Sequence, residues 1–216
     1  MKGVRLAERS PSARPLARAS TQKKLDRLLM KAAGLIAEKG FAAMSMRDLQ
    51  ASLGVSLAGH YHYFSSKDDL LFQLQHRTFS ALFKQQQRIA AEPGTPEERL
   101  RRLLTGHLHF YAEHTAELKS CTFELESLRG KPYKIVEEIR RDYYRLMTSV
   151  IAEVVGGPEA PREESREIRH LTLFVFGMLN WAYTWYDRSR HGTAEEISRE
   201  MWEFVLNGLK HRVSSN

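Results

Sequence analysis

The segment from Gly54 to Leu71 holds many side chains that donate hydrogen bonds and few that are purely aliphatic. Histidine and tyrosine alternate over positions 60–63, and two serines and Lys67 follow directly after Phe64. Such side chains can donate to phosphate oxygens and to base edges, whereas a core segment carries mostly aliphatic groups. The segment therefore indicates a surface that contacts nucleic acid. The alternative is a solvent-facing helix with its tyrosine and phenylalanine rings packed beneath.

The formal net charge of the 216-residue chain is +7, and the whole excess lies in its first third. Residues 1–77 hold 13 Lys and Arg against 6 Asp and Glu, whereas residues 78–216 hold 20 of each. This asymmetry predicts a polyanionic partner for the first third. Nucleic acid fits better than an anionic membrane, and a basic surface that contacts only solvent is the alternative.

A second set of residues has side chains that could bind a metal. His107, Tyr111 and His114 share one helical face, but no third strong ligand is placed beside them. Glu167 and His170 form a single Glu-x-x-His pair, whereas a carboxylate-bridged di-metal bundle needs two. The sequence contains no nucleophile elbow, phosphate loop or zinc-protease signature. We therefore expect no bound metal, no cofactor and no catalytic site.

Short helices must position the donor-rich segment. From Thr21, apolar residues recur at three- and four-residue steps, which predicts a helix that ends at Gly40. Ser45 with Asp48 predicts a capping box at the start of the next helix. These signals place two helices ahead of the segment.

A tight turn at Gly54 follows these two helices, and Ser56 can then cap a third helix. Ser66 with Asp69 predicts a further capping box, which opens a helix through Phe79. A helix, a short glycine-containing turn and a second helix form the helix-turn-helix plan.

The rest of the chain shows only helical patterns. Residues 1–20 are rich in Arg, Ser, Ala and Pro and predict a flexible basic arm. Thr95 and Thr193 predict the starts of two later helices, the last one over 194–211. We expect an all-α fold. Its predicted parts are the arm at 1–20, a three-helix helix-turn-helix DNA-binding module at 21–68 and a larger helical body at 69–216.

Several properties indicate where the protein acts. The chain has no apolar run of the roughly 18 residues that a membrane span requires, and its first residues lack the apolar core of a secretory signal. Its single cysteine, Cys121, excludes an intrachain disulfide and fits a reducing compartment. We expect a cytoplasmic protein that does not bind membranes.

The segment from Gly40 to Leu71, GFAAMSMRDLQASLGVSLAGHYHYFSSKDDLL, resembles the DNA-binding domain of the tetracycline-repressor (TetR) family. The matching elements are Gly-Phe at its start, Ser-Met-x-Asp-Leu at 45–49, Gly-Val-Ser at 54–56, Tyr-x-Tyr-Phe at 61–64 and Ser-Lys at 66–67. The resemblance implies a homodimeric bacterial regulator that binds a palindromic operator in double-stranded DNA. Most such regulators are repressors that a small ligand releases, which assigns ligand binding and dimerisation to the body.

Family roles carry over to individual positions of this sequence. Arg47 matches a base-reading position and Ser45 a phosphate contact, and Ser56 belongs to the same DNA-binding set. The predicted base-facing residues are Leu57, Ala58, Gly59 and Tyr61, and the predicted phosphate contacts are His62, Tyr63 and Lys67. Gln50, His60 and Ala58 depart from the usual Ala, aliphatic residue and Gly. Because Leu57 and Gly59 offer bases no side-chain hydrogen bond, specificity is expected to depend on Arg47, methyl contacts and DNA shape.

The body carries a second, weaker resemblance. Gly-Met-Leu-Asn-Trp at 177–181 and Trp-Tyr-Asp at 185–187 are similar to segments of TetR-type regulators of fatty-acid, steroid and aromatic-acid catabolism, which respond to acyl-CoA thioesters. Apolar residues that could line an effector pocket are Leu108, Tyr111, Phe123, Tyr144, Phe174, Met178, Trp181 and Trp185. Arg141 and Arg145, four residues apart, could contact the CoA phosphates. Core or dimer interface is the alternative for the apolar set, and a solvated basic face for the arginines.

The sequence thus predicts a ligand-responsive DNA-binding transcription regulator, a repressor that an acyl-CoA removes from its operator. Two alternatives stay open. One is a TetR-type regulator that responds to a cationic drug-like ligand, with Glu124 or Glu126 in the pocket. The other is a helical metal- or lipid-binding enzyme, against which the confined charge and the single Glu-x-x-His both count.

Overall fold

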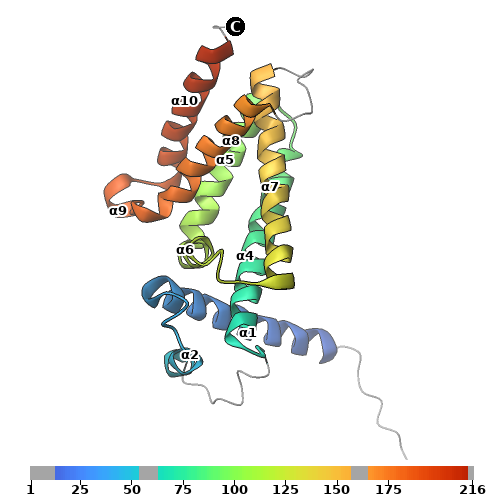
Figure 1. The fold of residues 1–216 in the computed structure, drawn as a ribbon, viewed down its shortest axis with the longest axis vertical. Coiled ribbons are helices and arrows are strands. Elements are labelled where there is room, and N and C mark those ends of the chain that lie inside the picture. The colour runs from blue at the N-terminus through green and yellow to red at the C-terminus, as the bar shows by residue number, and fades with distance from the viewer. Residues whose placement is uncertain (1–12, 54–62, 157–164, 214–216) are drawn as a thin grey trace, which may run out of the picture.

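The computed structural model of the chain describes residues 13–53, 63–156 and 165–213 (Figure 1). In these three ranges every regular element is a helix, and none is a strand. The predicted all-α fold class is confirmed.

Helix α1 (Ala13–Lys39) begins before Thr21, so residues 13–20 of the predicted arm are helical. Ala, Leu and Arg dominate this stretch and are strong helix formers, and Pro15 falls in the first turn, where proline is tolerated. The helix ends at Gly40 as predicted, because this residue adopts a positive φ of 79°.

Helices α2 (Met46–Leu53) and α4 (Lys67–Ala90) begin where capping residues predict them. Ser66 is the N-cap of α4, and its hydroxyl accepts a hydrogen bond from the N–H of Asp69 at 3.0 Å. The Asp69 carboxylate reaches the N–H of Ser65 at 2.8 Å, one residue before the expected partner. The start of α4 is therefore fixed by side chains on both sides of the cap.

The long helices of the body lie roughly along one direction, whereas the short α6 is seen end-on (Figure 1). The body elements are α5 (Pro96–Glu113), α6 (Thr115–Phe123), α7 (Gly130–Gly156), α8 (Arg166–Trp181), the short η1 (Ala182–Thr184) and α9 (Arg188–His191), and α10 (Ala194–Val213). Helix α4 leads from the N-terminal module into the body and packs on α5 and α7, while α1 crosses the end of the bundle against α6.

Two apolar cores stabilise the molecule. The body core joins α4, α5, α6, α7, α8 and α10, with residues such as Leu104, Met147 and Leu179 fully buried. The N-terminal core joins α1, α2 and the start of α4, but it also takes in Cys121 of α6 and Val136 of α7. Because α6 and α7 contribute to both regions, the N-terminal module rests directly on the body.

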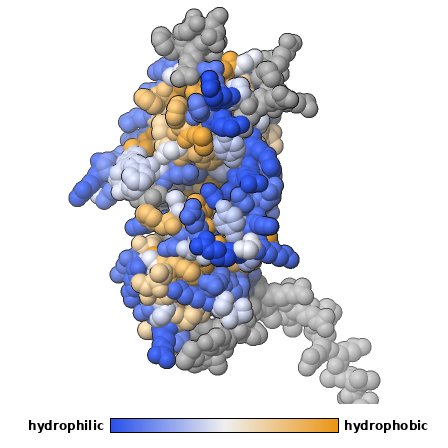
Figure 2. Space-filling model, viewed as in Figure 1, coloured by the Kyte–Doolittle hydropathy of each residue, from blue (hydrophilic) through white to orange (hydrophobic). Residues whose placement is uncertain are grey.

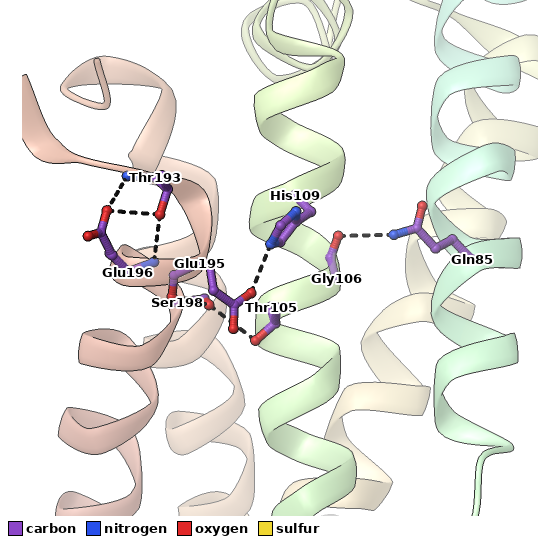
Figure 3. A network of polar contacts seen from close by, with 8 residues as sticks. All are labelled: Gln85, Thr105, Gly106, His109, Thr193, Glu195, Glu196 and Ser198. Atoms are coloured by element: carbon purple, nitrogen blue, oxygen red, sulfur yellow. Dashed lines mark hydrogen bonds and ion pairs between the residues drawn. The ribbon is translucent and has the colours of Figure 1, made fainter. Parts of the chain in front are cut away.

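Helix α10 packs against α5 through polar contacts as well as apolar ones (Figure 3). The Thr105 hydroxyl donates to the Ser198 hydroxyl at 3.2 Å, and His109 Nε2 lies 3.1 Å from the Glu195 carboxylate. These contacts fix the position of α10 along α5.

Helix α4 approaches α5 closely on the opposite side. A Cβ atom at Gly106 would lie 2.4 Å from Ile89 Cδ1, so only glycine fits here without rearrangement. The Gly106 carbonyl accepts a hydrogen bond from Gln85 Nε2 at 3.1 Å (Figure 3). This close contact holds the next residue of α5, His107, at the centre of the body.

Candidate functional site

The predicted DNA-binding residue Ser45 caps α2. Its hydroxyl accepts from the N–H of Asp48 at 3.1 Å, and the Asp48 carboxylate accepts from the Ser45 N–H at 2.7 Å. Hydrogen bonds from the Ser45 side chain and backbone, and then from Lys39, lower the pKa of Asp48 to about 2. Asp48 is therefore ionised at any physiological pH, and the start of α2 is held in a fixed geometry.

Three further predicted DNA contacts lie beside this cap. Arg47 is exposed on the first turn of α2, free to reach a partner from the surface. Lys67 Nζ donates to the Ala42 carbonyl at 3.1 Å and lies 4.4 Å from the centre of the Phe41 ring. Tyr63 is half-buried at the edge of the N-terminal core. Their contacts with DNA remain predictions.

The remaining predicted DNA-binding residues lie outside the described residues. They are Ser56, Leu57, Ala58, Gly59, Tyr61 and His62.

A cavity of about 220 Å³ lies in the body, bounded by α4, α5, α6, α7 and α8. Most of its wall is apolar, and the rings of Tyr143, Tyr144 and Phe176 contact one another on one side of it. The lining residues are Phe79, Leu82, His107, Leu118, Thr122, Leu125, Ile139, Arg140, Tyr143, Tyr144, Leu173, Phe176 and Asn180. Apolar walls with a few polar groups are typical of small-molecule sites.

The buried polar groups of the cavity are a hydrogen-bonded pair. His107 Nδ1 lies 2.9 Å from the Tyr143 hydroxyl, and both residues are almost fully buried. Burial lowers the pKa of His107 to about 4 and raises the pKa of Tyr143. Both side chains are therefore neutral near pH 7, and they offer a ligand hydrogen bonds without charge.

Among the described residues of the lining, Arg140 on α7 is the charged one. Its guanidinium carbon lies 5.8 Å from the centre of the Phe79 ring, at the far limit of a cation–π contact. The predicted arginines Arg141 and Arg145 face outward instead and pair with carboxylates of the same helix. The outer surface along α7 is correspondingly hydrophilic (Figure 2).

Of the residues predicted to bind the effector, Tyr144 lines this cavity. Leu108 and Tyr111 are buried in the body core, and Phe123 and Phe174 are both 61% exposed. The others, Met178, Trp181 and Trp185, line a separate, open hollow between α8 and α10. The structure therefore divides the predicted set among four places: the cavity, the core, the exposed surface and the hollow.

On α8, the residues that line the cavity are close neighbours in sequence of those predicted to line it. Leu173, Phe176 and Asn180 line the cavity, although Leu173 and Asn180 are also exposed to solvent, whereas Phe174 and Trp181 are exposed and do not line it. Both sets have helical spacing, because α8 is apolar on more than one face. Asn180, a polar residue inside the Gly-Met-Leu-Asn-Trp segment, is exposed and lines the cavity.

The wall of the cavity is hydrogen-bonded to the N-terminal module. Thr122 and Leu125, near the end of α6, line the cavity, and between them Glu124 accepts from the N–H of Phe41 at 2.8 Å through Oε1. Gln75 Nε2 of α4 donates to the Glu124 carbonyl at 2.7 Å. A shift of this end of α6 would therefore move the turn between α1 and α2.

Two structural features concern metals and membranes. The described part of the chain holds no cluster of three histidine, cysteine or acidic side chains that could bind a metal, and His107 is engaged with Tyr143. None of its helices is both long enough and apolar enough to span a bilayer.

Two family models match this chain. Residues 28–74 match the bacterial regulatory proteins of the tetR family, and residues 93–209, more than half of the chain, match the tetracyclin repressor-like C-terminal domain.

Several individual proteins are similar to this chain over most of their length. The HTH-type transcriptional repressor KstR2 of Mycobacterium tuberculosis is 23% identical over 84% of this chain and 90% of its own. PfmR of Thermus thermophilus, a TetR family transcriptional regulator, has a structure that superposes with a TM-score of 0.75 at 27% identity, covering 85% of this chain and 98% of that one. AibR, solved in complex with isovaleryl coenzyme A and operator DNA, superposes with a TM-score of 0.71 at 21% identity, covering 83% and 96%. The chain thus belongs to the TetR family of bacterial transcription regulators.

Proposed function

We propose that this chain is a repressor that binds a palindromic operator as a homodimer and is released by an acyl-CoA thioester. KstR2 is a named transcriptional repressor, and AibR was crystallised with both an acyl-CoA and operator DNA. Within the chain, one observation carries the proposal: an apolar cavity whose wall is hydrogen-bonded to the N-terminal module.

The dimensions of the cavity decide which part of an acyl-CoA it would hold. Pockets for drug-sized molecules measure about 300–1,000 Å³. At about 220 Å³ the cavity suits an acyl group and is too small for the whole thioester. The CoA phosphates would stay at the surface, because burying their charge unpaired costs far more than apolar contact returns.

A cationic ligand, the alternative within the family, finds little support in the lining. Among the described residues that line the cavity there is no carboxylate, and Arg140 would repel a cation. The Glu124 carboxylate is engaged by Phe41 and Ser127, and Glu126 is exposed at the surface.

The proposed mechanism is a shift between two populations of the dimer. An acyl group in the cavity would press on Leu118, Thr122 and Leu125 of the α6 region, and the bonds of Glu124 to Phe41 and of Ser120 to Ala33 would transmit the movement to α1. The two DNA-binding modules would then lie at a spacing that no longer matches successive major grooves.

The dimer would form through α8 and α10. Phe174, Trp181 and Phe204 are 61%, 62% and 72% exposed in the single chain, and such large apolar groups together on one surface are typical of an interface. Paired across a two-fold axis, α8 and α10 would make a four-helix interface. We further propose that the protein is a regulator without catalytic activity and that it acts in the cytoplasm.

A thermal-shift panel tests the effector. A ligand that binds only the folded state, at a hundred times its dissociation constant, should stabilise the protein by about 2.7 kcal/mol. Acyl-CoAs of graded length should raise the melting temperature, whereas free CoA and cationic dyes should not. A rise in melting temperature with the cationic dyes alone would reject the proposal that the effector is a thioester.

A further inference from the structure

Helix α7 carries three arginines in close succession, and they differ in their partners. Arg141 pairs with Glu137 at 2.9 Å, and Arg145 pairs with Glu138 at 3.1 Å and Asp142 at 2.7 Å. Both point away from the cavity and already have their charges balanced.

Arg140 differs from these two in burial and in partner. It is half-buried, it lines the cavity, and within the described residues no carboxylate lies within 4 Å of its guanidinium. Burial lowers its pKa, while Tyr133 and Glu137 nearby partly raise it. A guanidinium keeps its charge in proteins, so Arg140 presents a partly desolvated cation that forms no ion pair with a described residue.

The other described residues of the lining are uncharged. His107 and Tyr143 bond to each other in neutral form, and Thr122 and Asn180 add a hydroxyl and an amide. The Glu137 carboxylate, which acts on the charge of Arg140, is not part of the lining and pairs with Arg141. An anionic group inside this cavity would therefore meet one cation and no carboxylate among the described lining residues.

We infer that Arg140 selects the effector and that the part of the effector inside the cavity carries a carboxylate. The inference rests on the proposed function because it takes this cavity as the effector site. A planar guanidinium binds a carboxylate through two parallel hydrogen bonds, and a single arginine balances its single charge. The CoA phosphates carry more charge than one arginine balances, and the cavity is too small to admit them with the acyl group. Thioesters of dicarboxylic acids are the effector class that this arrangement favours.

Two thioesters with six-carbon acyl chains test the inference, hexanoyl-CoA with a terminal methyl group and adipoyl-CoA with a terminal carboxylate. Their affinities for the full-length protein would be measured by titration calorimetry, with free CoA and free adipate as further ligands. We expect adipoyl-CoA to bind about ten- to a hundred-fold more tightly than hexanoyl-CoA, the range of a hydrogen bond to a charged group. Arg140→Gln should abolish this preference, Arg140→Lys should keep part of it, and Arg141→Gln, the matched change on the exposed face, should leave it intact.

The outcomes separate this inference from the proposed function. Tight binding of hexanoyl-CoA without preference for adipoyl-CoA would overturn the inference that the effector carries a carboxylate in the cavity, but it would leave the thioester proposal standing. Equal weakening of both thioesters and of free CoA by Arg140→Gln would assign the arginine to a CoA phosphate, which also overturns the inference. Binding of free adipate that depends on Arg140, with no binding of either thioester, would support the inference and reject the thioester. If the wild-type protein binds none of these ligands, both ideas fail.

Discussion

Glu124 connects the cavity to the DNA-binding module, and its replacement by glutamine should weaken the coupling between effector and operator. The carboxylate accepts from the backbone N–H of Phe41 at 2.8 Å, in the turn between α1 and α2. Its neighbours Thr122 and Leu125 line the cavity. Glutamine keeps the shape and still accepts this bond, but without the charge that strengthens it.

The size of the effect follows from the strength of this bond. A hydrogen bond to a charged group contributes about 1.5–3 kcal/mol and a neutral one about 0.5–1.5 kcal/mol. Because Glu124 is only half-buried, solvent screens its charge, and we take about 1 kcal/mol for the difference between the charged and the neutral hydrogen bond. Coupling free energies between sites are typically about 1–3 kcal/mol. Glu124→Gln should therefore reduce the effector-induced change in operator affinity by about five-fold.

The assay is fluorescence anisotropy on a labelled duplex, selected from a random library by the ligand-free protein. Operator affinity would be measured with and without saturating effector for the wild type, Glu124→Gln and Glu126→Gln. Glu126 is exposed, so its replacement should leave the coupling unchanged. By linkage, operator DNA should change the effector affinity by the same factor in each protein. An unaltered coupling in Glu124→Gln, with normal folding, would refute the proposed path through α6.

Three further predictions concern DNA, pH and assembly. Lys67→Ala should weaken binding to all duplexes and reduce the slope of log binding constant against log salt concentration by about one. Arg47→Ala should instead relax the sequence preference at one base pair per half-site, and equal behaviour of the two variants would contradict these roles. His107 has a pKa of about 4 when folded and an ordinary value when unfolded, so the unfolded state binds the extra proton between about pH 6.5 and 4. Stability should fall by up to about 3 kcal/mol as the pH drops through this window, and denaturant titrations of His107→Leu should lack this loss. Phe204 on α10 is 72% exposed and should lie in the dimer interface. The Phe204→Glu variant should therefore sediment as a monomer at micromolar concentration, whereas a stable dimer would place the interface elsewhere.

Local chemistry made much of the fold predictable. Ser66 caps α4, Thr95 with Glu98 caps α5, and Thr193 with Glu196 caps the last helix, as the sequence predicts. Each cap needs only residues three positions apart, so the signal is complete within one helical turn. The boundary between α5 and α6 was missed, because His114 makes no side-chain cap bond at the start of α6.

The site was less predictable because it depends on which helix face meets which neighbour. Successive residues of a helix point in directions about 100° apart, so Arg140 and Arg141 have similar sequence signals and opposite surroundings. Leu173 and Phe174 on α8 present the same difficulty, since both are apolar and only one lines the cavity. Only packing against α4 and α7 distinguishes these neighbours.

Release of the protein from its operator by an acyl-CoA in the body cavity can be followed by titrating the preformed protein–operator complex. A thioester that raises the melting temperature would be added to the complex, with free CoA as the control and anisotropy of the labelled duplex as the readout. We expect the anisotropy to fall to the value of free DNA as the thioester saturates the cavity, and to stay unchanged with free CoA. A complex that remains fully bound while the thioester occupies the protein would contradict the proposed release.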